Sequence, residues 1–225
     1  MYAKFLKRGI DIFLSFIALI VLSPVLLVMI ILGAVIMKGN PFFTQLRPGK
    51  DEKIFRLIKF RSMTCETDEN GNLLPDDKRL TKYGQVIRDL SLDELPELIN
   101  IFIGDMSIVG PRPQLVRDMV FMSSDQRRRH TVRPGLTGLA QASGRNGISW
   151  ENKLNLDLQY IEDITFVNDV KIIFKTAIGV IKRDGISEEG MATAEDFGDY
   201  LLGRGDIDED AYQKGQEQAK ELMLL

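Results

Sequence analysis

The chain has 225 residues, 44% of them hydrophobic, and a formal net charge of −3. It contains one cysteine and one histidine, which excludes an internal disulfide and a zinc site built from several histidines. The sequence also lacks the glycine motifs of Walker and Rossmann nucleotide-binding folds and the serine elbow of hydrolases. The chemistry must therefore rest on other residues, and no nucleic-acid partner is expected.

An apolar segment near the N-terminus, residues 12–37, carries no charge. As a straight helix it would reach roughly 39 Å, which is enough to cross a bilayer. Pro24 at its centre removes a backbone donor and clashes with the carbonyl of Ile20, and Ser23 can satisfy the freed carbonyls, so a kink is expected at Ser23 and Pro24.

Basic residues flank this segment on both sides: Lys4, Lys7 and Arg8 before it, and Lys38, Arg47, Lys50, Lys53 and Arg56 after it. Such residues belong on the cytoplasmic side of a membrane, so both ends of the segment favour the same side. A bent helix that enters one leaflet and returns satisfies the kink and the charges together. A kinked but ordinary membrane span is the alternative.

We divide the chain into a membrane-anchoring helix over 1–40, a soluble domain over 41–186 and an acidic C-terminal tail over 187–225. Because acidic residues gather after Ser187, the domain before it is net basic, which suits anionic lipids and phosphate ligands. Amphipathic segments at 113–121 and 170–181 are candidates for lying along the membrane interface, with ordinary core packing as the alternative.

Within the domain, extended segments at 41–45 and 53–60 with a turn at 47–50 predict a β-hairpin. A polar loop over 64–80 precedes a helix over 81–90, with Arg88 in its last turns. The next helix has an apolar face of Leu95, Leu98, Ile99 and Phe102 and ends at Gly104, and two further helices cover 154–161 and 170–181. We expect an α+β fold, mostly helical with a short β-hairpin or small sheet, carried on the broken membrane helix.

Two adjacent carboxylates, Asp93 and Glu94, lie where that second helix is expected to begin. They can be read as capping residues, because Ser91 and Glu94 match a capping box and Asp93 alone could be an N-cap. They can also be read as a reactive pair, because a helix N-terminus attracts phosphate. One carboxylate could then attack phosphorus while its neighbour holds a divalent metal such as Mg²⁺.

Two arginines lie in turns framed by glycine or proline: Arg112 in the Gly-Pro-Arg-Pro motif at 110–113, and Arg145 in Gly-Arg-Asn-Gly at 144–147. Such turns can hold a guanidinium in the direction needed to bind phosphate with two hydrogen bonds. Residues 133–138 form a similar glycine- and proline-containing turn. The run of arginines at 127–129 is expected on the solvated surface.

Taken in order, these motifs resemble the bacterial sugar transferases, the monotopic phosphoglycosyl transferase family. The resemblance covers nearly the full length and fades after Thr193. Its motifs are Lys7-Arg8 with Asp11, Ser23-Pro24, Phe43-Thr44-Gln45, Arg47-Pro48-Gly49, Lys59-Phe60-Arg61-Ser62-Met63, Ser91-Leu92-Asp93-Glu94-Leu95-Pro96, Gly104-Asp105-Met106-Ser107, Gly110-Pro111-Arg112-Pro113, Arg133-Pro134-Gly135-Thr137-Gly138 and Gly144-Arg145-Asn146.

The resemblance implies a catalytic domain over 41–186 that moves a sugar phosphate from a UDP-sugar, with an N-acetylated amino sugar favoured, to undecaprenyl phosphate. The catalytic residues would be Asp93, which carries the phosphosugar after UMP leaves, and Glu94, which would hold Mg²⁺. The residues that would bind phosphate are Lys59, Arg61, Arg88, Arg112 and Arg145, and those anchoring the membrane interface are Lys7 and Arg8.

This reaction would take place on the cytoplasmic face of the bacterial inner membrane, against membrane lipids, and would begin the synthesis of a glycoconjugate that downstream glycosyltransferases extend. Two other classes remain open. One is a membrane-attached hydrolase that uses the same carboxylates and Mg²⁺ to cleave a diphosphate with water. The other is a non-catalytic scaffold of a glycan pathway.

Overall fold

The computed structural model describes residues 2–144, 148–182 and 195–224. The described helices are α1 (Lys7–Val21), α2 (Ser23–Ile36), α3 (Asp76–Arg79), α4 (Lys82–Asp89), α5 (Glu97–Ile103), α6 (Val116–Met119), α7 (Ser124–Arg127), α8 (Leu139–Gly144), α9 (Trp150–Glu162), α10 (Phe166–Lys182), α11 (Phe197–Arg204) and α12 (Glu209–Leu224). The strands are β1 (Phe42–Pro48), β2 (Ile54–Phe60), β3 (Ser107–Val109) and β4 (Gly135–Thr137). Short π-helical or 3₁₀ turns cover Tyr2–Leu6, Lys50–Glu52, Leu92–Glu94 and Arg128–Thr131. The predicted α+β class is confirmed.

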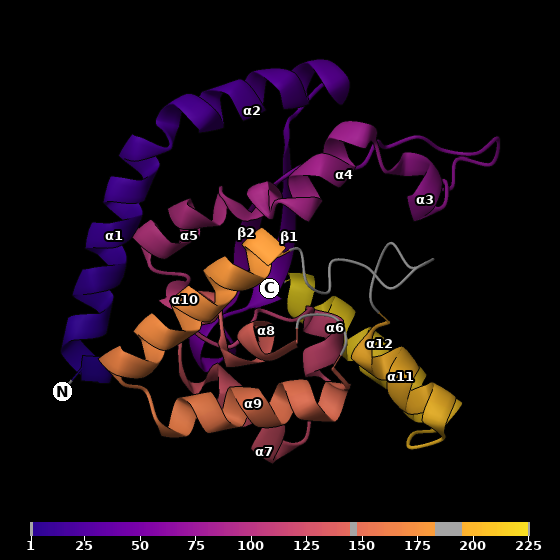
Figure 1. Cartoon of the computed structure of the whole chain (residues 1–225). Helices are drawn as coiled ribbons and strands as arrows, with labels where there is room; N and C mark the ends of the chain where they lie inside the picture. The colour runs from indigo at the N-terminus through magenta and orange to yellow at the C-terminus, as the bar shows by residue number, and fades with distance from the viewer. Residues whose placement is uncertain (1, 145–147, 183–194, 225) are drawn as a thin grey trace.

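The N-terminal apolar segment is two helices with a bend of 64° between them. Figure 1 shows α1 running up one side of the molecule and α2 passing over its top. Pro24 lies in the first turn of α2, and the Ser23 hydroxyl donates to the carbonyl of Ile20 at 2.7 Å, so the predicted break is confirmed. Among the described residues, no helix alone has the length and apolar character to cross a bilayer, whereas the bent pair together does.

The two basic residues that begin α1 contact the protein itself. Lys7 pairs with the buried carboxylate of Asp169 on α10, Nζ to Oδ2 2.5 Å. Arg8 donates to the carbonyls of Ile101 (2.6 Å) and Phe102 (2.9 Å) at the C-terminal end of α5. These contacts dock α1 onto the domain, and the membrane-interface anchoring predicted for Lys7 and Arg8 stays a prediction.

The predicted hairpin is present, with β1 and β2 antiparallel and Phe42 opposite Phe60. The expected turn at 47–50 lies further along, since Arg47 and Pro48 belong to β1 and the chain reverses at Gly49 and the following 3₁₀ turn. The amide of Gly49 donates to the carbonyl of Lys53 at 2.8 Å and closes this loop. The hairpin is therefore longer than the sequence indicated.

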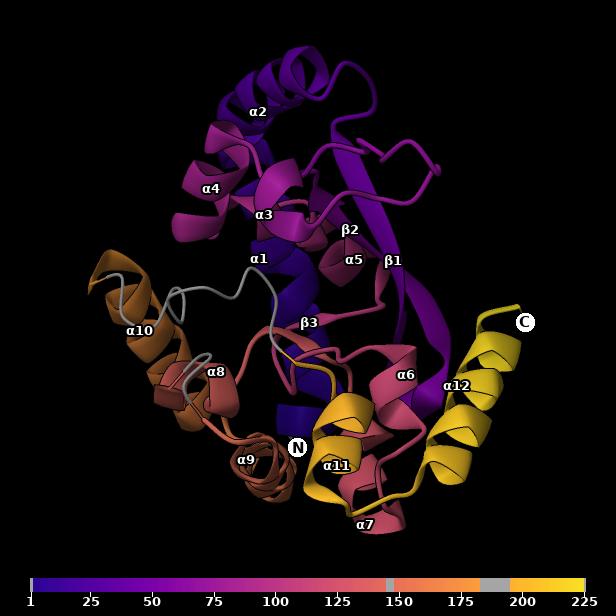
Figure 2. The ribbon, with the colours of Figure 1, turned by 90° about the vertical axis from the view of Figure 1, so that its right-hand side faces the viewer.

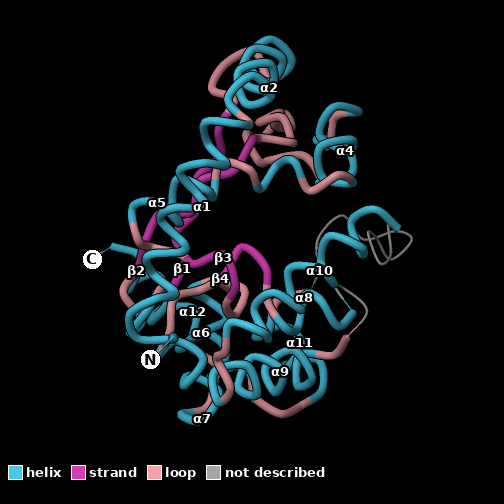
Figure 3. The backbone as a smooth tube through the Cα atoms, turned by 60° about the vertical axis from the view of Figure 1, so that its left-hand side comes forward, coloured by secondary structure: helices cyan, strands magenta, loops and turns pink. Residues whose placement is uncertain are grey.

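A second pair of strands was missed by the sequence analysis. β3 and β4 run parallel, and β4 occupies the segment predicted as a turn at 133–138 (Figure 3). Gly135 permits the pairing, because a Cβ there would lie 2.1 Å from the nitrogen of Gly110. The buried carboxylate of Asp11 on α1 accepts from the Ser107 hydroxyl (2.8 Å), which ties the start of β3 to α1.

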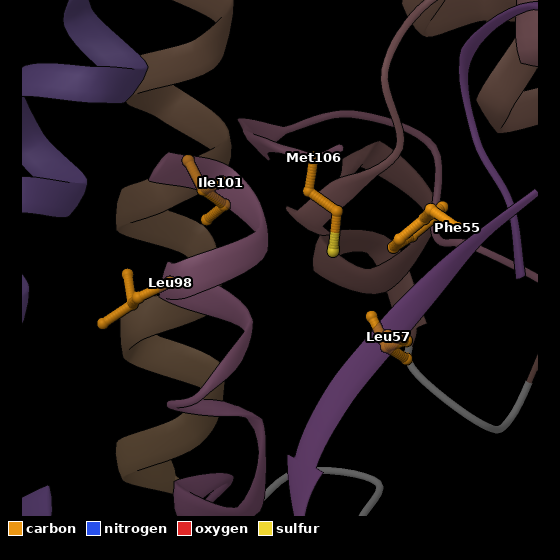
Figure 4. Packing of buried hydrophobic residues seen from close by; sticks show 5 residues of the cluster. All are labelled: Phe55, Leu57, Leu98, Ile101 and Met106. Atoms are coloured by element: carbon orange, nitrogen blue, oxygen red, sulfur yellow. The ribbon is translucent and has the colours of Figure 1, made fainter. Parts of the chain in front are cut away.

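The main hydrophobic core joins the hairpin to α5. Its buried members are Phe55, Leu57, Leu98, Ile101 and Met106, from β2, α5 and the segment before β3 (Figure 4). Partly buried residues of α1 pack against this cluster. The core therefore fixes α5, and with it the turn that precedes α5, against both the hairpin and α1.

The described part of the acidic C-terminal segment forms α11 and α12, which pack against the domain (Figure 2). Phe197 lies in a buried cluster with Trp150 and Leu154, and Ala219 packs on Val116 and Met119 of α6. The segment 113–121 thus follows its core-packing alternative at α6. On α10, by contrast, a face of apolar side chains remains exposed: Phe166, Val167, Phe174 and Ile178.

We expect Gly215→Ala to destabilise the protein by about 1–3 kcal/mol, because an added Cβ would lie 2.4 Å from two ring atoms of Phe121. That ring also stacks on Tyr212, which limits its ability to move away. Thermal unfolding in detergent measures the change. Gly203→Ala on α11 is the control, since nothing lies within 4 Å of its Cβ position. Equal melting temperatures for the two variants would contradict this packing.

Candidate active site

The acidic pair lies on the 3₁₀ turn between α4 and α5. The helix α5 begins at Glu97, so Asp93 and Glu94 precede it rather than opening it. Neither capping alternative forms: Ser91 adopts a left-handed backbone with φ 53° and makes no side-chain cap, and the N-cap of α5 is Pro96. Because proline cannot donate a backbone hydrogen bond, it separates the turn from the helix.

Glu94 is the centre of a charge cluster drawn from three separate segments. Its Oε1 accepts from Lys59 Nζ of β2 at 2.7 Å and from Arg112 Nη2 at 2.8 Å. Lys59 also lies 3.1 Å from Oε1 of Glu97, which is buried in the first turn of α5. Lys59 and Arg112 therefore lie beside the acidic pair and their phosphate-binding role stays a prediction, whereas Glu97 is a member of the cluster that the sequence analysis missed.

The three carboxyls of this cluster have different proton affinities. Burial disfavours charge on Glu94, but Arg112 and Lys59 outweigh it and hold its pKa far below the usual range. Burial raises the pKa of Glu97 to about 7 despite the opposing charge of Lys59. Burial also raises the pKa of Asp93, opposed by Lys59 and assisted by the negative charge of Glu94. Glu94 is therefore the firmly ionised partner, and Asp93 has the more basic carboxylate of the two.

Arg88 is close enough to Asp93 for its charge to lower the pKa of that carboxyl. It lies in the last turn of α4, as predicted, and its Nε donates to the buried hydroxyl of Ser62 at 2.9 Å. This bond fixes the arginine against the segment that follows β2. The α4 helix therefore adds a third positive side chain to the surroundings of the acidic pair.

The remaining predicted phosphate ligands have different positions. Arg61 follows β2 and is half-buried, and its backbone amide donates to the carbonyl of Pro41 at 2.7 Å. Arg145 lies outside the described residues. The structure thus brings Asp93, Glu94, Lys59, Arg88 and Arg112 together and leaves these two as predictions.

A divalent metal has a limited set of donors here. Among the described residues, no group of three or more histidine, cysteine, aspartate or glutamate side chains is arranged to hold a metal ion. Both cationic contacts of Glu94 fall on Oε1. Mg²⁺ commonly takes one or two carboxylate oxygens and completes its shell with phosphates and water. The pair Asp93 and Glu94 fits that mode, in which the substrate supplies most ligands.

Comparison with known proteins gives consistent matches. Residues 2–183 match the family described as bacterial sugar transferase. The chain is 50% identical over 170 residues to "Uncharacterized sugar transferase EpsL" of Bacillus subtilis, covering 75% of this chain and 82% of that protein. It is 37% identical over 200 residues to "Exopolysaccharide production protein ExoY" of Sinorhizobium fredii, covering 80% and 87%.

A further relative is "Undecaprenyl-phosphate galactose phosphotransferase" of Salmonella typhimurium, 37% identical over 201 residues. The match covers 81% of this chain but 42% of the Salmonella protein. The similarity therefore extends over most of this chain and over less than half of that longer relative.

Proposed function

The chain belongs to the bacterial sugar transferase family, and from that premise we propose that it moves a sugar phosphate from a UDP-sugar to undecaprenyl phosphate, releasing UMP. The observation that carries this proposal is the acidic pair surrounded by Lys59, Arg88 and Arg112. A diphosphate donor and a phosphate acceptor are both anions, so a site that joins them needs fixed positive charge beside its nucleophile. The product is an undecaprenyl-diphosphate sugar.

In the first step, a carboxylate oxygen of Asp93 attacks the β-phosphorus of the UDP-sugar. A new oxygen–phosphorus bond forms, the bond from the β-phosphorus to the bridging oxygen breaks, and UMP leaves with that oxygen. The raised pKa of Asp93 makes its carboxylate a better nucleophile than that of Glu94. The phosphosugar remains on Asp93 as a mixed anhydride.

In the second step, a phosphate oxygen of undecaprenyl phosphate attacks the phosphorus of the anhydride, and the Asp93 carboxylate leaves and is regenerated. This divides one displacement between two anions into two assisted displacements. Arg88 and Arg112 would neutralise phosphate charge in both steps, with Arg61 and Arg145 proposed as further contacts. Glu94 orients Arg112 and Lys59 through its Oε1.

Mg²⁺ is the proposed cofactor, with Glu94 as the principal ligand. When bound, such an ion neutralises the diphosphate oxygens and stabilises the leaving UMP. The donor sugar is proposed to be an N-acetylated amino sugar. A UDP-galactose donor is the second candidate, because the Salmonella relative is named for galactose.

The bent helix pair is proposed to enter the cytoplasmic leaflet of the bacterial inner membrane and return. Exposed apolar side chains along α1 and α2, such as Phe13 and Val35, support contact with acyl chains, and the apolar face of α10 supports attachment along the interface. This placement brings a soluble nucleotide sugar and a lipid phosphate to one site. The lipid-linked product would then pass to downstream glycosyltransferases.

We expect tags at the two ends of the chain to be accessible only from the cytoplasmic side. In Pro24→Ala, the fraction of molecules with ends on opposite sides of the membrane should rise. A proline in the interior of a straight helix destabilises that helix by about 3 kcal/mol, and the alanine variant removes this penalty. Protease protection of each tag in sealed vesicles measures this. Wild-type ends on opposite sides would contradict re-entry.

The proposed reaction is tested by measuring UMP release from a panel of UDP-sugars with Mg²⁺, with and without undecaprenyl phosphate. The panel includes UDP-galactose and N-acetylated amino sugars. Release of UMP together with a lipid-linked sugar from one donor is the expected result. Release of UMP and free sugar phosphate without the lipid would favour the hydrolase, and no UMP from any donor would count against both enzymes.

A further inference from the structure

The side chain of Arg112 reaches Glu94 from a backbone that is unusually restricted. Pro111 and Pro113 flank it, so the φ angles on either side are fixed and neither neighbour has an N–H to exchange with solvent. The amide of Gly110 donates to the carbonyl of Thr137 at 2.9 Å, which joins the start of this turn to β4. The turn is therefore anchored at its N-terminal end by main-chain hydrogen bonding.

Three consecutive carbonyls of the turn also accept hydrogen bonds from three different parts of the chain. The Pro111 carbonyl accepts from the amide of Gly135 at 2.9 Å. The Arg112 carbonyl accepts from Nη2 of Arg129 at 2.5 Å, and the Pro113 carbonyl accepts from Nη1 of Arg47 at 3.1 Å. Two of the three donors are thus guanidinium groups.

Arg129 is the more deeply buried of these two donors. Its residue is 2% exposed, which differs from the surface position predicted for 127–129. Its Nε and Nη2 donate to Oδ2 of Asp157 on α9, at 2.9 and 2.6 Å, and the Asp157 side chain is 2% exposed. A buried pair of this kind is a poor source of stability compared with apolar residues of the same size. The hydrogen bond from Arg129 to the Arg112 carbonyl offers a functional reason for the buried Arg129–Asp157 pair.

We propose that Arg129, seated on Asp157, is a positioning residue that fixes the direction of Arg112. Nη2 of Arg129 is shared between Asp157 and the Arg112 carbonyl, so the guanidinium links α9 to the turn. Within the part of the chain that the structure describes, Arg129 contacts Asp157 and the Arg112 carbonyl but neither carboxylate of the acidic pair, so it acts through Arg112. The inference rests on the proposed function, in which Arg112 neutralises phosphate charge.

Arg129→Lys is the conservative test, because one ammonium group cannot reproduce the planar fork that meets Asp157 and the carbonyl together. We expect sugar-phosphate transfer to fall about a hundredfold, mainly in kcat, since a small misplacement of a charge-stabilising group has effects of that size. A second variant, Arg129→Met with Asp157→Leu, removes the link without leaving a lone buried charge. Both variants should show the same loss.

Two readouts separate positioning from general damage. The first is the order parameter of the Arg112 Nε–H in ¹⁵N-arginine NMR spectra of the protein in lipid nanodiscs, which needs no activity. It should fall in both variants. The second is a double-mutant cycle with Arg112→Ala. In the Arg112→Ala background, Arg129→Lys should lower UMP release less than threefold, because the effect of Arg129 passes through Arg112.

The control is Arg133→Lys, since Arg133 also braces a carbonyl, donating from Nε to Gly104 at 2.7 Å, but at the far end of α5. It should leave the Arg112 order parameter unchanged. An unchanged Arg112 order parameter in both Arg129 variants would overturn the inference. So would an equal fold-loss of UMP release from Arg129→Lys in the wild-type and Arg112→Ala backgrounds. If the wild type releases no UMP, the proposed function fails, and the NMR result alone decides the positioning role.

Discussion

Asp93→Asn should abolish sugar-phosphate transfer, with UMP release reduced at least about a thousandfold, while the protein stays folded and bound to membranes. The amide keeps the shape of the carboxylate but cannot attack phosphorus. Arg88 and the contacts of Glu94 with Lys59 and Arg112 would remain in place, so the variant removes the proposed nucleophile and leaves the charge cluster. UMP release and membrane fractionation measure the two halves of this prediction.

The same substitution should leave thermal stability unchanged or raise it. The pKa of Asp93 is raised in the folded protein, chiefly by burial. When a carboxyl has a raised pKa in the folded protein, the protein loses stability as the pH rises from the ordinary aspartate pKa, near 3.9, toward the folded pKa. The reason is that this carboxyl ionises first in the unfolded chain. At pH 7 the neutral amide avoids that loss. A gain in stability with a loss of activity is typical of a functional carboxylate.

Mass spectrometry supplies an independent check on the nucleophile. Wild-type protein incubated with the active UDP-sugar and no lipid acceptor should carry a phosphosugar on the peptide containing Asp93, and Asp93→Asn should carry none. Asp77→Asn, an exposed substitution on α3, is the matched control and should behave as the wild type. Full activity or adduct formation in Asp93→Asn would move the nucleophile to another residue.

The sequence could predict the elements around this site because local patterns determine them. The helix break follows from Pro24, the end of α5 from Gly104, and the start of α4 from Thr81, whose side chain accepts from the Gly84 amide. It could not predict which face of α5 is buried. The spacing of apolar residues placed Ile99 on the buried face, but Ile99 is exposed.

Polar residues occupy the buried face of α5 because each has a specific partner there. Asn100 is fully buried, and its side chain donates to the carbonyl of Arg56 at 2.9 Å and accepts from the amide of Ile58 at 3.1 Å. Glu97 is buried against Lys59. These partners lie on β2, far away in sequence, so no local periodicity indicates them. For the same reason the three-residue strands β3 and β4 had no sequence signal.

The second large effect concerns Glu94, which holds the cluster together. Glu94→Gln replaces the carboxylate, whose Oε1 accepts from both Lys59 and Arg112, with a neutral amide group. We expect transfer to fall about 10²–10³-fold, because oriented positive charge beside the reacting phosphate is worth that much. The Mg²⁺ concentration needed for half-maximal activity should also rise. Initial rates across a Mg²⁺ titration measure both changes.

Glu94→Gln should also lower stability at pH 7, by about 1–3 kcal/mol, since it leaves two cationic donors without their carboxylate. The folded pKa of Glu94 is depressed, so its contribution is complete above the ordinary glutamate pKa, near 4.3, and fades as the pH falls toward the folded value. The difference between wild type and variant should therefore shrink in acid. Unfolding measured from pH 7 to pH 3 follows it.

Glu151→Gln is the matched control, because Glu151 also pairs with an arginine, Arg204, but with both side chains about half exposed. Exposed pairs contribute little, so its stability should change by less than about 1 kcal/mol and its activity should not change. Loss of activity in Glu94→Gln without any loss of stability would mean that Lys59 and Arg112 find other partners. Their alignment by Glu94 would then be needed only when phosphate is bound.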